Sequence, residues 1–118
     1  MTTDLPAGLD ALVAEKIMDD PVDRQIVDQH GFEIILCRSR QVLPRYSTDI
    51  AAAWTVVEKL RSMGFGVVID NLPSTSGKSV GWTVAVIGIS TQDTFAGTAD
   101  TAPLAIVRAA LKALEKTP

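Results

Sequence analysis

The sequence predicts an α/β (α+β) fold: a three-layer α/β/α sandwich with a small mixed three-stranded sheet and three helices, in the order α-β-α-β-β-α. Two observations predict it. Segments with apolar residues at helical spacing alternate with segments rich in β-branched residues. The chain has 118 residues, and domains cluster near ~100–150 residues, so there is material for one hydrophobic core. We therefore expect residues 1–118 to form a single domain.

A short amphipathic helix is expected over about residues 9–18. Its apolar residues at helical spacing are Leu9, Leu12, Val13 and Ile17. The helix should end just before Pro21, because proline donates no backbone hydrogen bond and disfavours a helical conformation at the preceding residue. A polar connector follows. In residues 32–37, the set Phe32, Ile34 and Leu36 alternates with the set Glu33, Ile35 and Cys37. The β-branched and aromatic content of this segment predicts a first strand with apolar groups on both faces.

The second helix is the clearest in the sequence. Ser47 or Thr48 could cap its free N–H groups, with Asp49 in the first turn, where a negative charge suits the helix dipole. Gly64 can adopt the left-handed conformation that commonly follows a helix. The predicted buried stripe consists of Ile50, Ala53, Trp54, Val57 and Leu60.

A hairpin and a third helix complete the predicted fold. Residues 65–70 and 81–90 are expected to be strands joined by a turn, and residues 91–100 a loop. The last helix should start near Ala102, with Thr101 as its cap and alanines that allow another backbone to approach closely. The first strand, second helix and second strand form a candidate βαβ unit, which would make those two strands parallel. A sheet this small could be completed by a second copy, so a homodimer is expected.

Composition excludes several classes of function. Eleven Lys and Arg against fourteen Asp and Glu give a net charge of −3, which disfavours general binding to nucleic acid. No segment has the roughly twenty apolar residues that a membrane span needs. The single cysteine, Cys37, cannot form an intramolecular disulfide, and the first residues lack a signal-peptide pattern. We therefore expect a cytoplasmic protein.

Catalytic and metal-binding patterns are missing from the sequence. Residues 72–79 end in Gly-Lys-Ser, but the first glycine of a phosphate-binding loop is absent and a strand, not a helix, is expected to follow. His30 and Cys37 have no spacing typical of a catalytic pair, and they are too few for a zinc site. We therefore expect no enzyme activity, no catalytic residues, no cofactor and no metal.

Two charged segments are candidate binding surfaces. The arginine segment has three arginines and no acid up to the start of the second helix, where N–H groups could help to hold a phosphate or carboxylate. It comprises Arg38, Arg40, Arg45, Tyr46, Ser47 and Thr48. Capping and solvation of the surface explain many of the same residues. The acidic face is Asp19, Asp20 and Asp23, which could contact a basic partner or simply be solvated.

Four blocks of the sequence resemble the phage ABA sandwich domain family. They are LDALVAEKIM at 9–18, PRYSTDIAAAWTVVEKL at 44–60, GWTV at 81–84 and TAPLAIVRAALKAL at 101–114. The sequence differs where the family would have Gly-Trp after the first helix, since Asp19 and Asp20 stand there. The resemblance implies layered helices and sheet, and an accessory phage or prophage protein acting in the bacterial cytoplasm.

Two functions are therefore expected from the sequence. The first is a non-enzymatic accessory protein that binds and modulates a host bacterial protein, such as a component of antiviral defence. The alternative is a binder that sequesters a nucleotide or another small anionic signal molecule at the arginine segment. A fold or family name does not by itself assign a site, and the arginine segment could serve either function.

Overall fold

The computed structural model describes residues 6–27, 29–31, 33–72, 81–89 and 92–116. The elements are α1 (Pro6–Lys16), β1 (Val22–Val27), β2 (Glu33–Cys37), α2 (Ile50–Ser62), β3 (Phe65–Leu72), β4 (Gly81–Gly88), β5 (Thr94–Ala99) and α3 (Ala102–Lys116). The predicted mixed α+β class, with three helices in a layered sandwich, is confirmed. The predicted turn at 73–80 lies outside the described residues.

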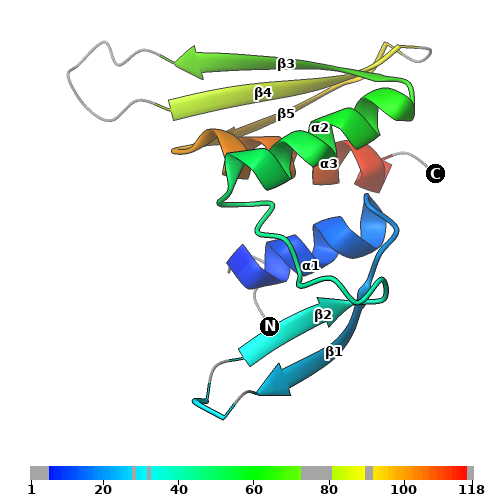
Figure 1. The fold of residues 1–118 in the computed structure, drawn as a ribbon. Helices are drawn as coiled ribbons and strands as arrows, with labels where there is room; N and C mark the ends of the chain where they lie inside the picture. Colours follow the sequence, from blue (N-terminus) through cyan, green and yellow to red (C-terminus); the bar gives the residue numbers. More distant parts are fainter. Residues whose placement is uncertain (1–5, 28, 32, 73–80, 90–91, 117–118) are drawn as a thin grey trace.

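The larger sheet is antiparallel, in the order β3-β4-β5. Val67 lies opposite Val86, and Val84 opposite Gly97, so the pleat places these residues on one face. That inner face is covered by α2, which packs mainly on β3, and by α3, which packs on β4 and β5 (Figure 1). The predicted hairpin between β3 and β4 is confirmed.

Helix α3 approaches β5 closely because both elements carry small residues at their contact. A Cβ atom built on Gly97 would lie 2.5 Å from the backbone nitrogen of Ala109 and 2.9 Å from the carbonyl oxygen of Ala105. Only a residue without a side chain fits between strand and helix. The prediction that the alanines of this helix allow another backbone to approach is confirmed.

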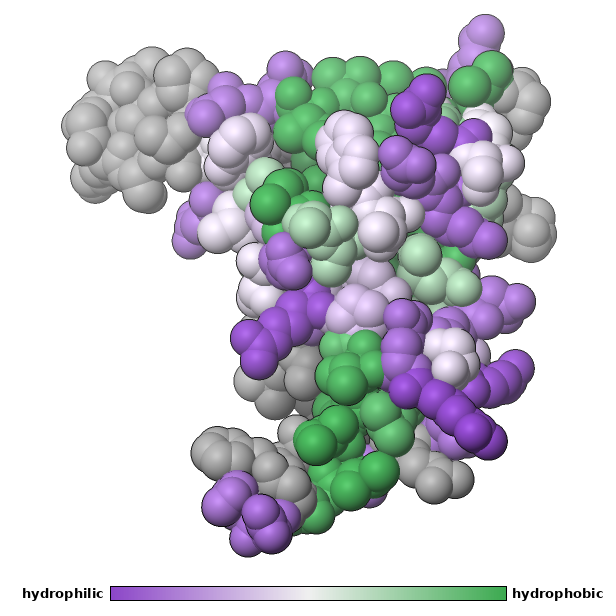
Figure 2. Space-filling view, viewed as in Figure 1, coloured by the Kyte–Doolittle hydropathy of each residue, from purple (hydrophilic) through white to green (hydrophobic). Residues whose placement is uncertain are grey.

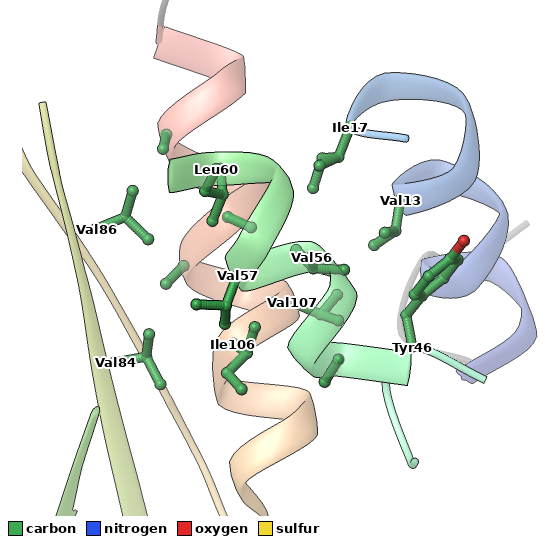
Figure 3. Packing of buried hydrophobic residues seen from close by; sticks show 14 of the residues in the cluster. Val13, Ile17, Tyr46, Val56, Val57, Leu60, Val84, Val86, Ile106 and Val107 are labelled. Carbon is green, nitrogen blue, oxygen red and sulfur yellow. The ribbon is translucent and has the colours of Figure 1, made fainter. Parts of the chain in front are cut away.

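A second layer lies on the other side of the helix pair. There α1 contacts α3, and strands β1 and β2 form a separate antiparallel hairpin beyond α1 (Figure 1). Val13 and Ile17 of α1 point toward Val56 of α2, while Val57 of the same helix points toward Val84 and Val86 of the large sheet (Figure 3). All these side chains are buried, so one core links the two layers.

The predicted parallel pairing does not form. Strand β2, the predicted first strand, pairs with β1 rather than with β3, and every strand pair is antiparallel. Two strands were not predicted. β1 has the sequence VDRQIV, whose polar residues resemble a connector, and β5 has the sequence TFAGTA, in which small residues replace the usual bulky ones. The close approach of α3 explains why β5 has glycine at position 97.

The predicted buried stripe of α2 is partly wrong. Trp54 is 48% exposed and Ile50 is 53% exposed, whereas Ala53, Val56, Val57 and Leu60 are buried. The helix packs on α3 and on β3 of the large sheet, and Val56 points toward α1 (Figure 3), so the buried sector is centred between these neighbours and Trp54 lies on its flank. Trp82 of β4 packs against the core.

The start of α2 also differs from the prediction. Asp49 is the N-cap, and its carboxylate accepts a hydrogen bond of 3.0 Å from the backbone nitrogen of Ala51. Neither Ser47 nor Thr48 caps the helix. At the other end, Gly64 has the predicted left-handed conformation, with φ 93°. No helix in the described ranges is long and apolar enough to cross a membrane.

Candidate binding surface

The turn after β2 carries two residues of the arginine segment, Arg38 and Arg40. The turn is closed by hydrogen bonds from the backbone nitrogen of Arg40 to the carbonyl of Cys37, at 2.8 Å, and from the nitrogen of Cys37 to the carbonyl of Gln41, at 2.9 Å. Leu36 and Val42 then form an antiparallel bridge. The chain therefore reverses tightly, and both arginines are exposed on the turn.

Arg40 occupies a backbone conformation that favours glycine. Its φ is 74°, in the left-handed region that costs a residue with a Cβ roughly 1–2 kcal/mol. A glycine would fit the turn better. The arginine at this position is therefore a candidate for a role other than folding, since strained residues concentrate at functional sites.

Asp20 anchors this turn to the end of the α1–β1 connection. Its carboxylate accepts hydrogen bonds from the backbone nitrogen of Ser39 at 2.9 Å, from the Ser39 hydroxyl at 2.7 Å and from Nε2 of Gln41 at 2.9 Å. These bonds, that of the Ser39 side chain above all, and the charge of Arg38 lower the pKa of the Asp20 carboxyl. Asp20 therefore holds the arginine-bearing turn in place.

A cavity of about 550 Å³ opens beside the turn. Its lining residues are Asp23, Leu36, Cys37, Arg38 and Arg40. The two guanidinium groups make the cavity suited to an anion, and Leu36 and Cys37 add an apolar part. The carboxylate of Asp23 adds a hydrogen-bond acceptor. The cavity therefore combines cationic, acidic and apolar groups.

The outer face of the hairpin carries an apolar strip beside this cavity. Ile35 and Cys37 of β2 point toward the core, so the alternate residues point away from it. The pairs Ile26–Ile34 and Leu36–Val42 share that outer face. We call these four residues the hairpin strip. Ile26 is 41% exposed and Val42 is 62% exposed. Figure 2 shows a hydrophobic cluster over the hairpin in this view.

The rest of the arginine segment lies apart from the cavity lining. Tyr46 and Ser47 are both 2% exposed, whereas Arg45 and Thr48 are exposed. Burial raises the pKa of Tyr46 to about 12. The backbone nitrogen of Ser47 donates to Oδ1 of Asp10 at 2.8 Å. Tyr46 and Ser47 thus tie the chain to α1, and the carboxylate of Asp49 already occupies the start of α2.

The acidic face is divided between three environments. Asp20 accepts hydrogen bonds from the turn at residues 38–41, and Asp23 lines the cavity together with Arg38 and Arg40. Asp19 is exposed at the end of the first helical segment, with φ 54°. The structure therefore brings Asp23 of the acidic face together with Arg38 and Arg40 of the arginine segment. At these three residues the two charged surfaces are not separate.

Sequence reasoning missed the hairpin strip. Apolar residues on both faces of the strand at 32–37 were recognised, but β1 was not, so the outer face had no position in the predicted fold. A useful signal was the match between Ile26 and Ile34 on either side of a turn containing Gly31, which has φ 83°. Val42 is brought to the strip only by the turn at 38–41.

The structure also gives the surroundings of Cys37 and of the possible metal ligands. Cys37 is buried, and burial raises the pKa of its thiol, with a smaller contribution from the charge of Asp20. The thiolate form that a nucleophile needs is therefore disfavoured. Among the residues that the structure describes, no three His, Cys, Asp or Glu side chains lie close enough to hold a metal ion.

Comparison with known proteins identifies one family. The model of the phage ABA sandwich domain family matches residues 11–111, which is most of the chain. The match spans α2 and the whole of the larger sheet, together with the hairpin strip and the cavity. No curated protein and no solved structure matches this chain.

Proposed function

The chain belongs to the phage ABA sandwich domain family, and from that premise we propose that it is a non-enzymatic phage accessory protein that binds a bacterial host protein. Its site of action is the host cytoplasm, and its effect is to modulate the host protein, a component of antiviral defence being the expected class. The observation that carries the proposal is the hairpin strip beside two arginines, with Ile26 and Val42 exposed and Ile34 and Leu36 half-buried.

The hairpin strip has the composition of a protein-binding surface. Contiguous exposed apolar side chains are typical of the centre of an interface, with polar and charged residues at its rim. Ile26, Ile34, Leu36 and Val42 supply the apolar centre. Arg38 and Arg40 supply a cationic rim on one side, and arginine is enriched among residues that dominate binding energy.

Charge defines the kind of host surface that fits. The two arginines lie on the same turn, so a partner with carboxylates beside an apolar patch would meet both the strip and the rim. The hydrogen bonds of Asp20 hold the turn in one conformation, which reduces the entropy lost on binding. The partner surface is therefore expected to be apolar and acidic.

A substitution in the strip tests the proposal. Val42→Asp introduces a charge at the most exposed residue of the strip, and Ile89→Asp is its matched control, because Ile89, just after β4, is 69% exposed. Both changes affect exposed residues, so both variants should fold. Tagged proteins would be recovered from a host lysate, and the captured protein would then be purified and titrated against each variant by calorimetry.

We expect at least a tenfold weaker affinity for Val42→Asp and an unchanged affinity for Ile89→Asp. A tenfold change corresponds to about 1.4 kcal/mol. If a host protein binds both variants as tightly as the original chain, it uses another surface and the strip is not the binding site. If no host protein binds the original chain, the proposed function is wrong.

The cavity favours a second candidate function, sequestration of a small anionic ligand such as a nucleotide. The supporting observation is that Arg38 and Arg40 line a cavity whose volume of about 550 Å³ is in the range of small-molecule sites. Leu36 and Cys37 could contact a base, and the carboxylate of Asp23 could accept hydrogen bonds from a ribose. This function requires the cavity, whereas protein binding requires the strip.

Arg40→Gly separates binding from folding. It removes the guanidinium but relieves the left-handed backbone conformation, so the variant should be as stable as the original chain or more stable. A screen of nucleotides by thermal shift is expected to raise the melting temperature of the original chain and not of Arg40→Gly. A ligand at 100 times its Kd stabilises a fold by about 2.7 kcal/mol. An absence of shifts for the original chain would reject this second function.

A further inference from the structure

We propose that two copies of the chain associate through the open edge of β3, in antiparallel orientation, to form a continuous six-stranded sheet. The proposal concerns the opposite end of the molecule from the hairpin strip and does not depend on the proposed function. It rests on three observations: the different treatment of the two sheet edges, the exposed flank of α2 beside β3, and the charges at the two ends of α2.

The two edges of the larger sheet differ. Strand β5 is one edge, and cations from α3 cover its carbonyls: Nη1 of Arg108 donates to the carbonyl of Thr98 at 2.8 Å, and Nζ of Lys112 donates to that of Ala96 at 3.0 Å. An edge whose carbonyls already have donors is a poor template for another strand. The β5 edge is therefore closed.

Strand β3 is the other edge and is built as a good template. Within the described part of the chain it pairs only with β4. It is eight residues long, FGVVIDNL, with no proline or lysine and no irregularity in its register with β4. Proline, lysine and bulges are features by which proteins prevent edge pairing, and the one charged residue of β3 is Asp70, so most of this edge can accept another strand. Val68, near its middle, is 46% exposed.

Helix α2 presents its exposed apolar side chains on the flank beside this edge. Val57 points toward the large sheet and Val56 toward α1 (Figure 3). Trp54 lies three positions before Val57, on the same side of the helix, and Ile50 lies one turn before Trp54. Because α2 packs on β3, the side chains of Trp54 and Ile50 flank that edge and are 48% and 53% exposed. A neighbour paired with β3 would cover them.

The charges of α2 favour a second copy of the same chain as that neighbour. A two-fold axis at the β3 edge would place α2 beside the α2 of the partner copy, running antiparallel to it. The helix begins at Asp49 and has Arg61 in its last turn, on the same flank as Trp54. In antiparallel packing each Arg61 faces the Asp49 end of the other helix, and the two exposed Trp54 side chains meet near the axis. The surface is thus complementary to itself.

Disulfide crosslinking tests the geometry directly. In the proposed pair, the two-fold axis is perpendicular to the sheet, so each residue keeps the same face of the sheet in both copies. Residues that pair across the two β3 strands must share a face. One residue of β3 must therefore lie directly opposite the same residue of the other copy. Single cysteines would be placed in turn at residues 66–70, with Cys37 buried and unreactive. Paired Cα atoms in adjacent strands are ~4.5–5.5 Å apart, which a disulfide can span. Ala96→Cys, on the closed edge, is the control.

Lysine substitution tests the same interface without crosslinking. Val68, Ala85 and Ala96 form one row across the outer face of the sheet, with Val68 and Ala96 at its opposite edges. Val68→Lys brings two like charges together near the axis, which destabilises strand pairing, whereas Ala96→Lys places the same charge on the closed edge. Trp54→Glu changes the helix contact and leaves both strands intact. Circular dichroism would confirm that each variant is folded.

Mass measured by sedimentation over a range of concentrations provides the readout. We expect a dimer for the original chain and for Ala96→Lys, and at least a tenfold larger dissociation constant for Val68→Lys and for Trp54→Glu. A disulfide-linked dimer should form from one β3 cysteine variant and not from Ala96→Cys. A monomer at all concentrations overturns the proposal. A dimer weakened equally by both lysines uses the open sheet face instead, and also overturns it.

Discussion

The carboxylate of Asp10 on α1 accepts a hydrogen bond of 2.8 Å from the backbone nitrogen of Ser47, which lies 37 positions later in the sequence. Both residues are buried, with Asp10 5% exposed. The bond fixes the segment before α2 against α1, and thereby the distance between the two layers of the fold. Burial raises the pKa of the Asp10 carboxyl, an effect only partly opposed by the Ser47 bonds and the charge of Arg45.

Substitutions at Asp10 should separate its hydrogen bond from its charge. Asp10→Ala leaves the Ser47 N–H buried without its acceptor, so we expect a loss of about 1–3 kcal/mol in the free energy of unfolding. Asp10→Asn keeps an acceptor and removes the buried charge, so it should be at least as stable as the original chain at pH 7. Urea unfolding would measure both. Equal destabilisation by the two substitutions would show that the charge itself is required.

The pH dependence at Asp10 has a defined sign. Because the folded pKa is raised above the ordinary value of 3.8, the folded state binds the proton more tightly than the unfolded chain. The contribution of Asp10 to stability is therefore greatest below that value and is lost as pH rises through the folded pKa. The stability gained by Asp10→Asn should accordingly grow from acid pH to pH 7. A constant difference across that range would contradict the raised pKa.

Asp20 should show the opposite dependence. Its folded pKa lies below 3.8, so its stabilising contribution is present above that value and is lost as pH falls through the folded pKa. Asp20→Asn is expected to be less stable than the original chain at pH 7, and the difference should disappear in strong acid. Unfolding measured between neutral and acid pH tests this. The variant should also loosen the turn at residues 38–41, which hydrogen exchange of the Ser39 amide would detect.

Two glycines of the larger sheet should respond differently to alanine. Gly97→Ala forces a Cβ against the backbone of α3, so we expect a destabilisation of about 1–3 kcal/mol or more. At Gly66 the nearest atom would be 3.9 Å from the added Cβ, an ordinary contact. Gly66→Ala should therefore stabilise the chain by roughly 0.5–1 kcal/mol, because alanine has less freedom to lose. Thermal unfolding of both variants is the measurement, and equal effects would exclude close packing at Gly97.

Leu60 and Trp54 test which side of α2 is buried. Leu60 is fully buried, so Leu60→Ala should cost about 2–5 kcal/mol. Trp54→Ala, at a half-exposed position, should cost less than about 1 kcal/mol at a protein concentration too low for the proposed dimer to form. Denaturant unfolding at low protein concentration would compare them. A larger loss at Trp54 than at Leu60 would show that the helix is rotated from the orientation described above.

Cys37 should be protected from alkylation in the folded protein. Its thiol is buried and has a raised pKa, so little thiolate is present near neutral pH. We expect iodoacetamide to react at least ~10 times more slowly with the native chain than with the chain in urea. Mass spectrometry of timed samples gives both rates. Rapid labelling of the native protein would show that the 37–41 turn opens readily.

The elements predicted correctly are those whose patterns depend on local sequence. Strand β4 has apolar residues in both alternating sets, and α2 ends at a glycine in the expected left-handed conformation. The missed strands, β1 and β5, have weak local patterns: β1 is polar and has an irregularity in its register with β2, and β5 is stabilised by its packing on α3. The exposure of Trp54 likewise depends on how α3 and the large sheet cover α2, which no local pattern of α2 records.

The candidate site was predicted only in part, for a similar reason. Arg38 and Arg40 were recognised because clustered cations are conspicuous in an acidic chain. Tyr46 and Ser47 were grouped with them by adjacency in sequence, but a buried carboxylate 37 residues away turns Ser47 inward. The hairpin strip is assembled from three separate stretches of chain. Its members became visible only with the register of β1 and β2.

The donors that Arg108 and Lys112 supply to β5 limit how far such a sheet can grow. A molecule with two open edges can add copies at both ends without limit and polymerise into a fibre. In the proposed dimer each copy has one closed edge, so association would stop after two copies, since the pair would present only β5 edges to solution. Arg108 and Lys112 would thus limit the size of the assembly. Neutralising both side chains would be expected to open the β5 edge and to allow copies to add without limit.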